Sequence, residues 1–242
     1  MRRTAAIAAT VLASVLVATG HAAGPSTTKF DDVTVKAGVE VRHHTRRFNG
    51  KAADVLRMFT SGGASAAVGD YDNDGFDDLF VTDSAEGTTS HLFHNNGNLT
   101  FTDVTATAGV GGGNDPRSIV SDALFFDYDN DGWEDLLVAR FGTPILYHNE
   151  KNGHFKDVSA TSGLTAFGNT IAAVAFDYDN DGRLDLMFGN YFKPRNLLDA
   201  AGIEQDPHVL PNDLDNAVNG GGVTLWHAVG VGRWENVTEK AG

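Results

Sequence analysis

The peptide Asp70-Tyr-Asp-Asn-Asp-Gly75 (DYDNDG) decides the fold, because the same six letters return at residues 127–132 and 177–182. Each copy follows a short apolar run rich in small residues and precedes an acidic residue and a second apolar run. Two apolar runs joined by a tight turn of Asp, Asn and Gly are typical of a β-hairpin. The shared surroundings predict three copies of one structural unit.

Two further elements recur in the same order after each copy of this peptide. One is a Leu-aromatic-His triplet, at residues 92–94, 146–148 and 225–227, and the other is an aromatic-x-[Asp/Asn]-Val-[Thr/Ser] pattern, at residues 101–105, 155–159 and 234–238. Four short strands in about 40–55 residues are typical of a propeller blade. We therefore predict an all-β fold, a partial β-propeller of about three four-stranded blades at about residues 62–107, 118–161 and 169–240.

The N-terminal segment, residues 23–61, contains the last-strand pattern by itself, as FDDVT at residues 30–34. We expect a lone closing strand there. Because propellers close with about 4–8 blades, three blades leave the ring open, and we expect a fragment of a longer propeller or a dependence on further chains. The alternative is a compact, non-circular stack of three blades. The third blade carries an insertion at residues 191–222, and a loop of this length is usually functional or disordered.

Residues 1–22 resemble a secretory signal peptide. Arg2 and Arg3 precede an uncharged Ala/Val/Leu-rich run, which ends in the small-residue sequence Gly20-His21-Ala22. We expect cleavage after Ala22, no membrane span in the mature chain, and a secreted, periplasmic or cell-surface location. The chain has no cysteine, which excludes disulfides and thiolate metal sites.

The formal net charge of −14 excludes nucleic acid as an expected partner, because phosphate backbones are bound by a surplus of Lys and Arg. Much of the acidity lies in the DYDNDG loops, which place carboxylates at positions 1, 3 and 5 before a glycine. Hard oxygen donors at this density suit Ca²⁺, which takes 6–8 oxygens. An EF-hand would have Glu at position 12, where this chain has Val81, Val138 and Phe188.

These loops, each with a further Asp at position 9, resemble the FG-GAP/VCBS repeats, calcium-binding blades also found in integrin α-subunits. The FDDVT segment, the small-residue openings before the loops and the VLPNDLDNAVNGGG stretch resemble, more closely, the cartilage acidic protein/UnbV group of secreted propellers. The resemblance covers about residues 29–242 and implies that Ca²⁺ is bound by side-chain carboxylates and, at position 7, by a backbone carbonyl. The implied ligands are Asp70, Asp72, Asp74, Phe76 and Asp78; Asp127, Asp129, Asp131, Trp133 and Asp135; and Asp177, Asp179, Asp181, Arg183 and Asp185.

The function that we expect is that of an exported calcium-binding module for adhesion or cell-envelope binding, without catalysis, whose partner is an extracellular protein or a glycan. The repeated His94, His148 and His227 are expected to serve blade packing, and the basic residues around His43 and His44 to form a solvated loop. The alternatives are a scaffold for a polysaccharide lyase or glycosidase, with its site on the insertion, and a purely structural segment. No nucleophile elbow, zinc-protease or phosphate-loop motif is present.

Overall fold

The computed structural model describes residues 29–48, 63–193 and 220–242. The expected signal peptide therefore lies outside the described residues, as does most of the expected insertion. The chain divides into two compact units, Met1–Asp32 and Val33–Gly242. Residues 29–32 of the first unit are irregular, and the fold described below is that of the second unit.

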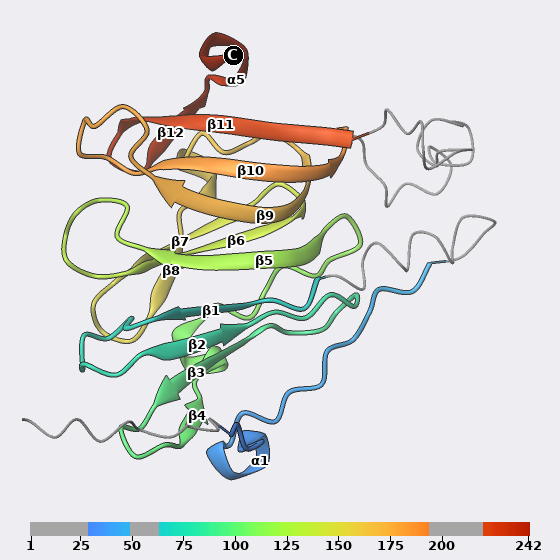
Figure 1. The fold of residues 1–242 in the computed structure, drawn as a ribbon, viewed down its shortest axis with the longest axis vertical. Helices are drawn as coiled ribbons and strands as arrows, with labels where there is room; N and C mark the ends of the chain where they lie inside the picture. Colours follow the sequence, from blue (N-terminus) through green and yellow to red (C-terminus); the bar gives the residue numbers. More distant parts are fainter. Residues whose placement is uncertain (1–28, 49–62, 194–219) are drawn as a thin grey trace, which may run out of the picture. The chain divides into compact units, whose positions relative to one another are not determined.

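Three successive four-stranded antiparallel units make up this fold (Figure 1). In each unit every strand pairs with its neighbour in sequence, as expected of a propeller blade. Blade 1 contains β1 (Ala66–Gly69), β2 (Asp78–Val81), β3 (His91–Asn95) and β4 (Phe101–Asp103); blade 2 contains β5 (Ile119–Phe126), β6 (Asp135–Gly142), β7 (Ile145–Asn149) and β8 (Phe155–Asp157); blade 3 contains β9 (Gly168–Phe176), β10 (Asp185–Phe192), β11 (Gly220–Gly230) and β12 (Arg233–Asn236). The prediction of an all-β partial propeller is confirmed.

Blades 2 and 3 are also joined by a short ladder that the sequence did not predict. The end of β6 pairs with the start of β9, through Phe141 with Asn169 and Gly142 with Gly168. In blade 3, β10 continues to Phe192 and β11 begins at Gly220, and these two residues pair with each other. The connection between the second and third strands is therefore shorter at both ends than the expected insertion at 191–222.

A helical turn follows the last strand of each blade. These turns are α3 (Thr105–Ala108), η2 (Ser159–Thr161) and α5 (Thr238–Ala241). Each begins where a Thr or Ser donates its backbone N–H and its hydroxyl to an Asp or Asn two residues earlier, as Thr105 does to Asp103 at 3.0 and 2.6 Å.

The expected strand at residues 30–34 is not observed. Thr34 instead begins a helical turn, α1 (Thr34–Ala37), and residues 30–33 pair with no strand among the described residues. The pattern that suggested a strand includes the Val-Thr step at which the other copies turn into a helix. A strand also needs a neighbour that takes its backbone hydrogen bonds, which β3 provides for β4.

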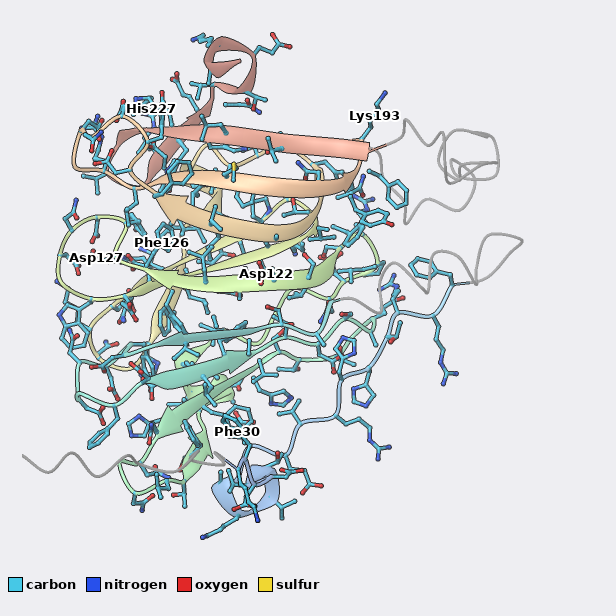
Figure 2. All side chains as sticks on the ribbon, viewed as in Figure 1. Phe30, Asp122, Phe126, Asp127, Lys193 and His227 are labelled. Carbon is cyan, nitrogen blue, oxygen red and sulfur yellow. The ribbon has the colours of Figure 1, made fainter. Side chains whose placement is uncertain are left out.

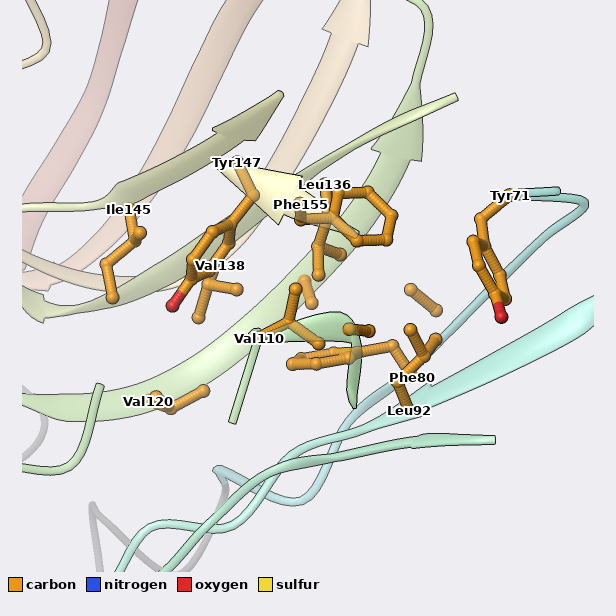
Figure 3. Packing of buried hydrophobic residues seen from close by; sticks show 13 residues of the cluster. Tyr71, Phe80, Leu92, Val110, Val120, Leu136, Val138, Ile145, Tyr147 and Phe155 are labelled. Atoms are coloured by element: carbon orange, nitrogen blue, oxygen red, sulfur yellow. The ribbon is translucent and has the colours of Figure 1, made fainter. Parts of the chain in front are cut away.

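The core consists of two layers of side chains, one at each junction between blades. Figure 3 shows the first layer, in which Phe80 and Leu92 from blade 1 pack with Leu136 and Val138 from blade 2. In the second layer, Leu137 of blade 2 packs with residues of blade 3 that include Leu186, Phe188 and Trp234. Adjacent residues of β6 thus point into opposite layers, as the twofold period of a strand requires.

Two of the glycines that follow a helical turn lie in close contact with the backbone of the following blade. Gly163 lies after η2 and has a left-handed backbone, with φ +82°. A side chain at this position would lie 2.3 Å from the carbonyl oxygen of Trp234 in blade 3. A side chain at Gly38, which follows α1, would lie 3.0 Å from the carbonyl oxygen of Phe101 in blade 1. Each glycine thus lies against the aromatic residue near the start of the last strand in the following blade.

Candidate metal-binding loops

The three DYDNDG loops lie in the first hairpin of each blade, between β1 and β2, β5 and β6, and β9 and β10. They gather at one end of the blades. Figure 2 shows Asp127 and His227 at this end, whereas Lys193, at the end of β10, lies at the opposite end. We call these loops 1, 2 and 3 in chain order.

The backbone of each loop is folded tightly by its own first carboxylate. In loop 1, Asp70 accepts hydrogen bonds from the N–H groups of Asp74, at 3.0 Å, and Gly75, at 2.9 Å. Asp127 and Asp177 accept the equivalent bonds in loops 2 and 3. The turn requires left-handed backbone at positions 4 and 6, where Asn73 has φ +57° and Gly75 has φ +88°. Asn and Gly are the residues that adopt this conformation most readily.

The ninth residue of each loop is a buried aspartate that ties the loop to the third strand. Asp78 accepts the N–H of Asn95 on Oδ1, at 2.7 Å, and the N–H of Tyr71 on Oδ2, at 3.2 Å. Asp135 and Asp185 accept equivalent pairs of bonds, and all three are at most 1% exposed. These aspartates therefore hold the hairpin together in addition to any role as ligands.

The carboxylates converge as a cation site requires. Ligand atoms from Asp70, Asp72 and Asp74 lie within 4.8 Å of one another in loop 1, and so do atoms from Asp127, Asp129 and Asp135 in loop 2. In loop 3, Asp179 and Asp185 approach each other in the same way, together with His227. Asp177 lies at the start of that loop and Asp181 follows at position 5.

Burial makes four of these carboxylates unfavourable as free anions, those of Asp72, Asp78, Asp129 and Asp135. It is the main cause that raises the pKa of Asp78 to about 6 and that of Asp135 to about 7. Burial, followed by the neighbouring carboxylates, also raises the pKa of Asp72 and Asp129. In both of these the Oδ1 atom is buried without a hydrogen-bond partner. A buried oxygen without a donor beside other carboxylates fits a divalent cation with oxygen ligands, such as Ca²⁺.

The residues at position 7 contribute backbone N–H groups whose partners the structure defines. Phe76, Trp133 and Arg183 donate these groups to the position-5 aspartates at 2.9–3.0 Å. Their carbonyl oxygens as ligands stay a prediction. Two cationic side chains also reach position 5, since Lys151 Nζ lies 2.9 Å from Asp131 and the Arg183 guanidinium pairs with Asp181. Any cation in loops 2 and 3 therefore shares a carboxylate with a basic side chain.

The repeated histidines lie at the loops, which the sequence interpretation missed. The Nδ1 atom of His94 is 3.1 Å from Asp72, and Nδ1 of His148 and of His227 is 3.1 Å from Asp135 and Asp185. The rings also pack edge-on or tilted against the tyrosine at position 2 of the loop, as His227 does against Tyr178. The expected packing role is therefore joined by a polar contact. The contact could have been predicted from the pairing of β2 with β3. Leu79 lies opposite Phe93, and this antiparallel register places the next residues, Asp78 and His94, side by side.

The basic segment near residue 44 contains one buried side chain, that of Arg46, although we expected a solvated loop. Arg46 is 6% exposed, donates to the carbonyl oxygens of Asp115 and Pro116, and pairs with Glu86 at 3.0 Å. His44 contacts the buried Asp83 through Nδ1 at 2.7 Å. The expectation of a solvated loop was wrong for Arg46, because acceptors from distant parts of the chain meet it, whereas His44 keeps an exposed side chain beside Asp83.

Comparison with protein families identifies the repeats. Residues 62–98 match the family described as FG-GAP repeat, and residues 127–188 match the family described as FG-GAP-like repeat. The first match spans loop 1 with its strands, and the second spans loops 2 and 3. A comparison with curated proteins found none that matches this chain. The chain thus contains FG-GAP repeats arranged as blades of a partial β-propeller.

Proposed function

We propose that this protein is an exported calcium-binding propeller module, which binds one Ca²⁺ in each of its three loops and serves adhesion or binding outside the cell. The observation that carries the proposal is the buried, unpartnered Oδ1 atom of Asp72 and of Asp129, each among converging carboxylates. FG-GAP repeats are typical of extracellular proteins. Among the described residues, no helix has the length and apolar character needed to cross a membrane.

The ligands proposed for each ion are the carboxylates at positions 1, 3, 5 and 9 and the carbonyl at position 7. The ion would neutralise carboxylates that otherwise repel one another, so its binding would contribute to folding stability. Extracellular sites of this kind need only weak affinity, with dissociation constants of about 10⁻⁴–10⁻³ M. The finer likeness to the cartilage acidic protein/UnbV group belongs to this proposal as well.

The described residues include one cluster that resembles a catalytic triad in composition, and its geometry supports a binding role without catalysis. Ser84, His43, His44 and Asp83 have the residue types of a hydrolase triad. However, Asp83 contacts His44, at 2.7 Å, whereas Ser84 contacts His43, at 2.8 Å. The carboxylate and the hydroxyl therefore use different imidazoles, and the relay that activates a serine is not formed.

The partner that we propose is an extracellular protein or a glycan, bound at the end of the blades opposite the metal loops. The connection between β10 and β11 emerges there, and most of the expected insertion at 191–222 lies outside the described residues. Loops at the ends of a rigid sheet scaffold are where binding residues concentrate. Pull-down of extracellular material with the chain, and with a variant lacking the connection, tests this part of the proposal.

Calorimetric titration of the metal-free chain with Ca²⁺, with thermal melting in parallel, tests the metal sites. We expect one equivalent per loop, and at a free concentration 100-fold above the dissociation constant a stabilisation of about 2.7 kcal/mol per site. Mg²⁺ should have little effect, because it demands a tighter octahedral shell.

Two matched variants of loop 1 separate specific binding from charge screening. Asp72→Asn should remove one equivalent of Ca²⁺, whereas Asp77→Asn, which removes the same charge from an exposed neighbour, should remove none. Equal effects of the two variants, or a wild-type chain that binds no Ca²⁺, would contradict the proposed sites.

A further inference from the structure

Neighbouring metal loops are connected by an asparagine side chain. Asn73 of loop 1 donates from Nδ2 to the carbonyl oxygen of Gly132 in loop 2, at 2.9 Å. Asn130 of loop 2 donates in the same way to Gly182 of loop 3, at 3.1 Å. Both asparagines occupy position 4 of DYDNDG and both acceptors occupy position 6, so one contact is repeated at two junctions.

The donor in each contact is fixed by the loop to which it belongs. Asn73 and Asn130 are in left-handed backbone, with φ of +57° and +58°. Asn73 lies between Asp72 and Asp74, which are both among the converging carboxylates of loop 1. A cation that holds these two carboxylates would therefore also fix the direction in which the asparagine side chain leaves the loop.

The acceptor in each contact is one peptide bond away from a candidate ligand. The carbonyl of Gly132 and the N–H of Trp133 belong to the same peptide unit, and that N–H donates to Asp131 at 3.0 Å. In loop 3 the N–H of Arg183 donates to Asp181 at 2.9 Å. Because a peptide unit is planar and rigid, a bond to its carbonyl also orients its N–H and the carboxylate that accepts it.

We infer that the three loops do not bind metal independently, and that Asn73 and Asn130 act as positioning residues through which a cation in one loop raises the affinity of the next. This inference rests on the proposed function. Thermodynamic linkage makes the effect reciprocal, so each loop gains from the occupation of its neighbour. One net hydrogen bond corresponds to a change in affinity of about two- to tenfold.

The chain offers a matched control in Asn180, the equivalent residue of loop 3. It has the same left-handed backbone, with φ +61°, and within the described ranges its side-chain amide has no hydrogen bond to another loop. Asn→Gly is the suitable change at all three positions, because glycine keeps the left-handed conformation and removes only the amide. Asn73→Gly and Asn130→Gly then break the contacts, and Asn180→Gly reproduces the chemical change without breaking one.

Ca²⁺ titrations of the metal-free full chain, combined as a double-mutant cycle, test the inference. In the wild-type chain, disabling loop 1 with Asp72→Asn should weaken binding to the two remaining loops by about two- to tenfold. In the Asn73→Gly background the same loss of loop 1 should have no further effect. Asn130→Gly should reduce the cooperativity of binding while every loop still binds one equivalent, and Asn180→Gly should behave as the wild type.

Charge coupling between the loops is the competing cause. Glu134 is half-buried near acidic residues, and its pKa is raised by burial and then by Asp70, Asp77 and Asp127. Loop 3 has Leu184 at the corresponding position, so the Asn130 contact acts without this charge. Repeating the titrations at high salt screens charges but should leave the hydrogen-bonded coupling in place.

The outcomes of these titrations are distinct. Three equivalents of Ca²⁺ bound independently in the wild-type chain, or equal effects of Asn73→Gly and Asn180→Gly, overturn the inference and leave the metal sites intact. A wild-type chain that binds no Ca²⁺ overturns the proposed function and this inference together. Melting curves of each metal-free variant verify that the fold is retained.

Discussion

Replacing Asp135 with alanine should destabilise the chain even when no metal is bound. The Asp135 carboxylate accepts the buried N–H groups of Asn149, at 2.7 Å, and Tyr128, at 3.3 Å. Each buried donor left without a partner costs about 1–3 kcal/mol, so Asp135→Ala should lower the free energy of unfolding by about 2–6 kcal/mol. Asp129→Ala should change it by about 1 kcal/mol or less, because Oδ1 of Asp129 has no hydrogen-bond partner to lose.

Urea unfolding of the metal-free variants near pH 5 measures this difference. At this pH the Asp135 carboxyl is largely neutral in the folded state, since burial raises its pKa to about 7, so the folded wild-type chain and the folded Asp135→Ala variant carry the same charge at this position. In Ca²⁺ titrations at neutral pH, Asp129→Ala should still remove one equivalent. Equal stabilities of the two metal-free variants would refute the idea that position 9 holds the hairpin and position 3 serves mainly the metal.

Three further changes follow from the same contacts. The melting temperature of the metal-free chain should fall as the pH rises from about 4 to about 7. The folded pKa values of Asp78 and Asp135 are raised, so these carboxyls stabilise the folded chain at low pH, and this stability is lost when they ionise. With saturating Ca²⁺ the fall should disappear. Lys151→Gln should strengthen Ca²⁺ binding in calorimetry by up to about fivefold, because the ammonium no longer competes for Asp131, whereas Lys36→Gln, on α1, should not. Leu137→Ala, at a fully buried position, should lower the free energy of unfolding by about 2–5 kcal/mol in urea denaturation, and a change below 1 kcal/mol would contradict the described layer.

The features that the sequence predicted well are those that depend on neighbouring residues. The strands on either side of DYDNDG and the tight turn of Asp, Asn and Gly between them arise within one hairpin. Repetition added confidence in the order of the strands, since one pattern of turns and apolar runs occurs three times.

The features that escaped prediction depend on contacts between distant segments. Arg46 is buried because Asp115, Pro116 and Glu86 meet it, and none of these is near it in sequence. The ladder between β6 and β9 depends on how far each strand extends past its own hairpin. The turn at Thr34 was predictable in retrospect, because the Asp-x-Thr capping pattern of Asp103 and Thr105 favours a helix start over a strand.

The glycine that closes each helical turn has a consequence for how such chains can be rearranged. A side chain at Gly163 would meet the backbone of Trp234, so blade 2 fits blade 3 in this arrangement only with glycine at this position. The boundary of blade 2 as an exchangeable module therefore falls just after this glycine, and not in the gap between two sheets. At the junction of blades 1 and 2 the demand is weaker, since a β-carbon at Gly109 would lie 3.8 Å from the carbonyl oxygen of Phe155, and a module cut after Gly109 would be constrained there by the left-handed backbone of this glycine, with φ +78°, rather than by a close contact.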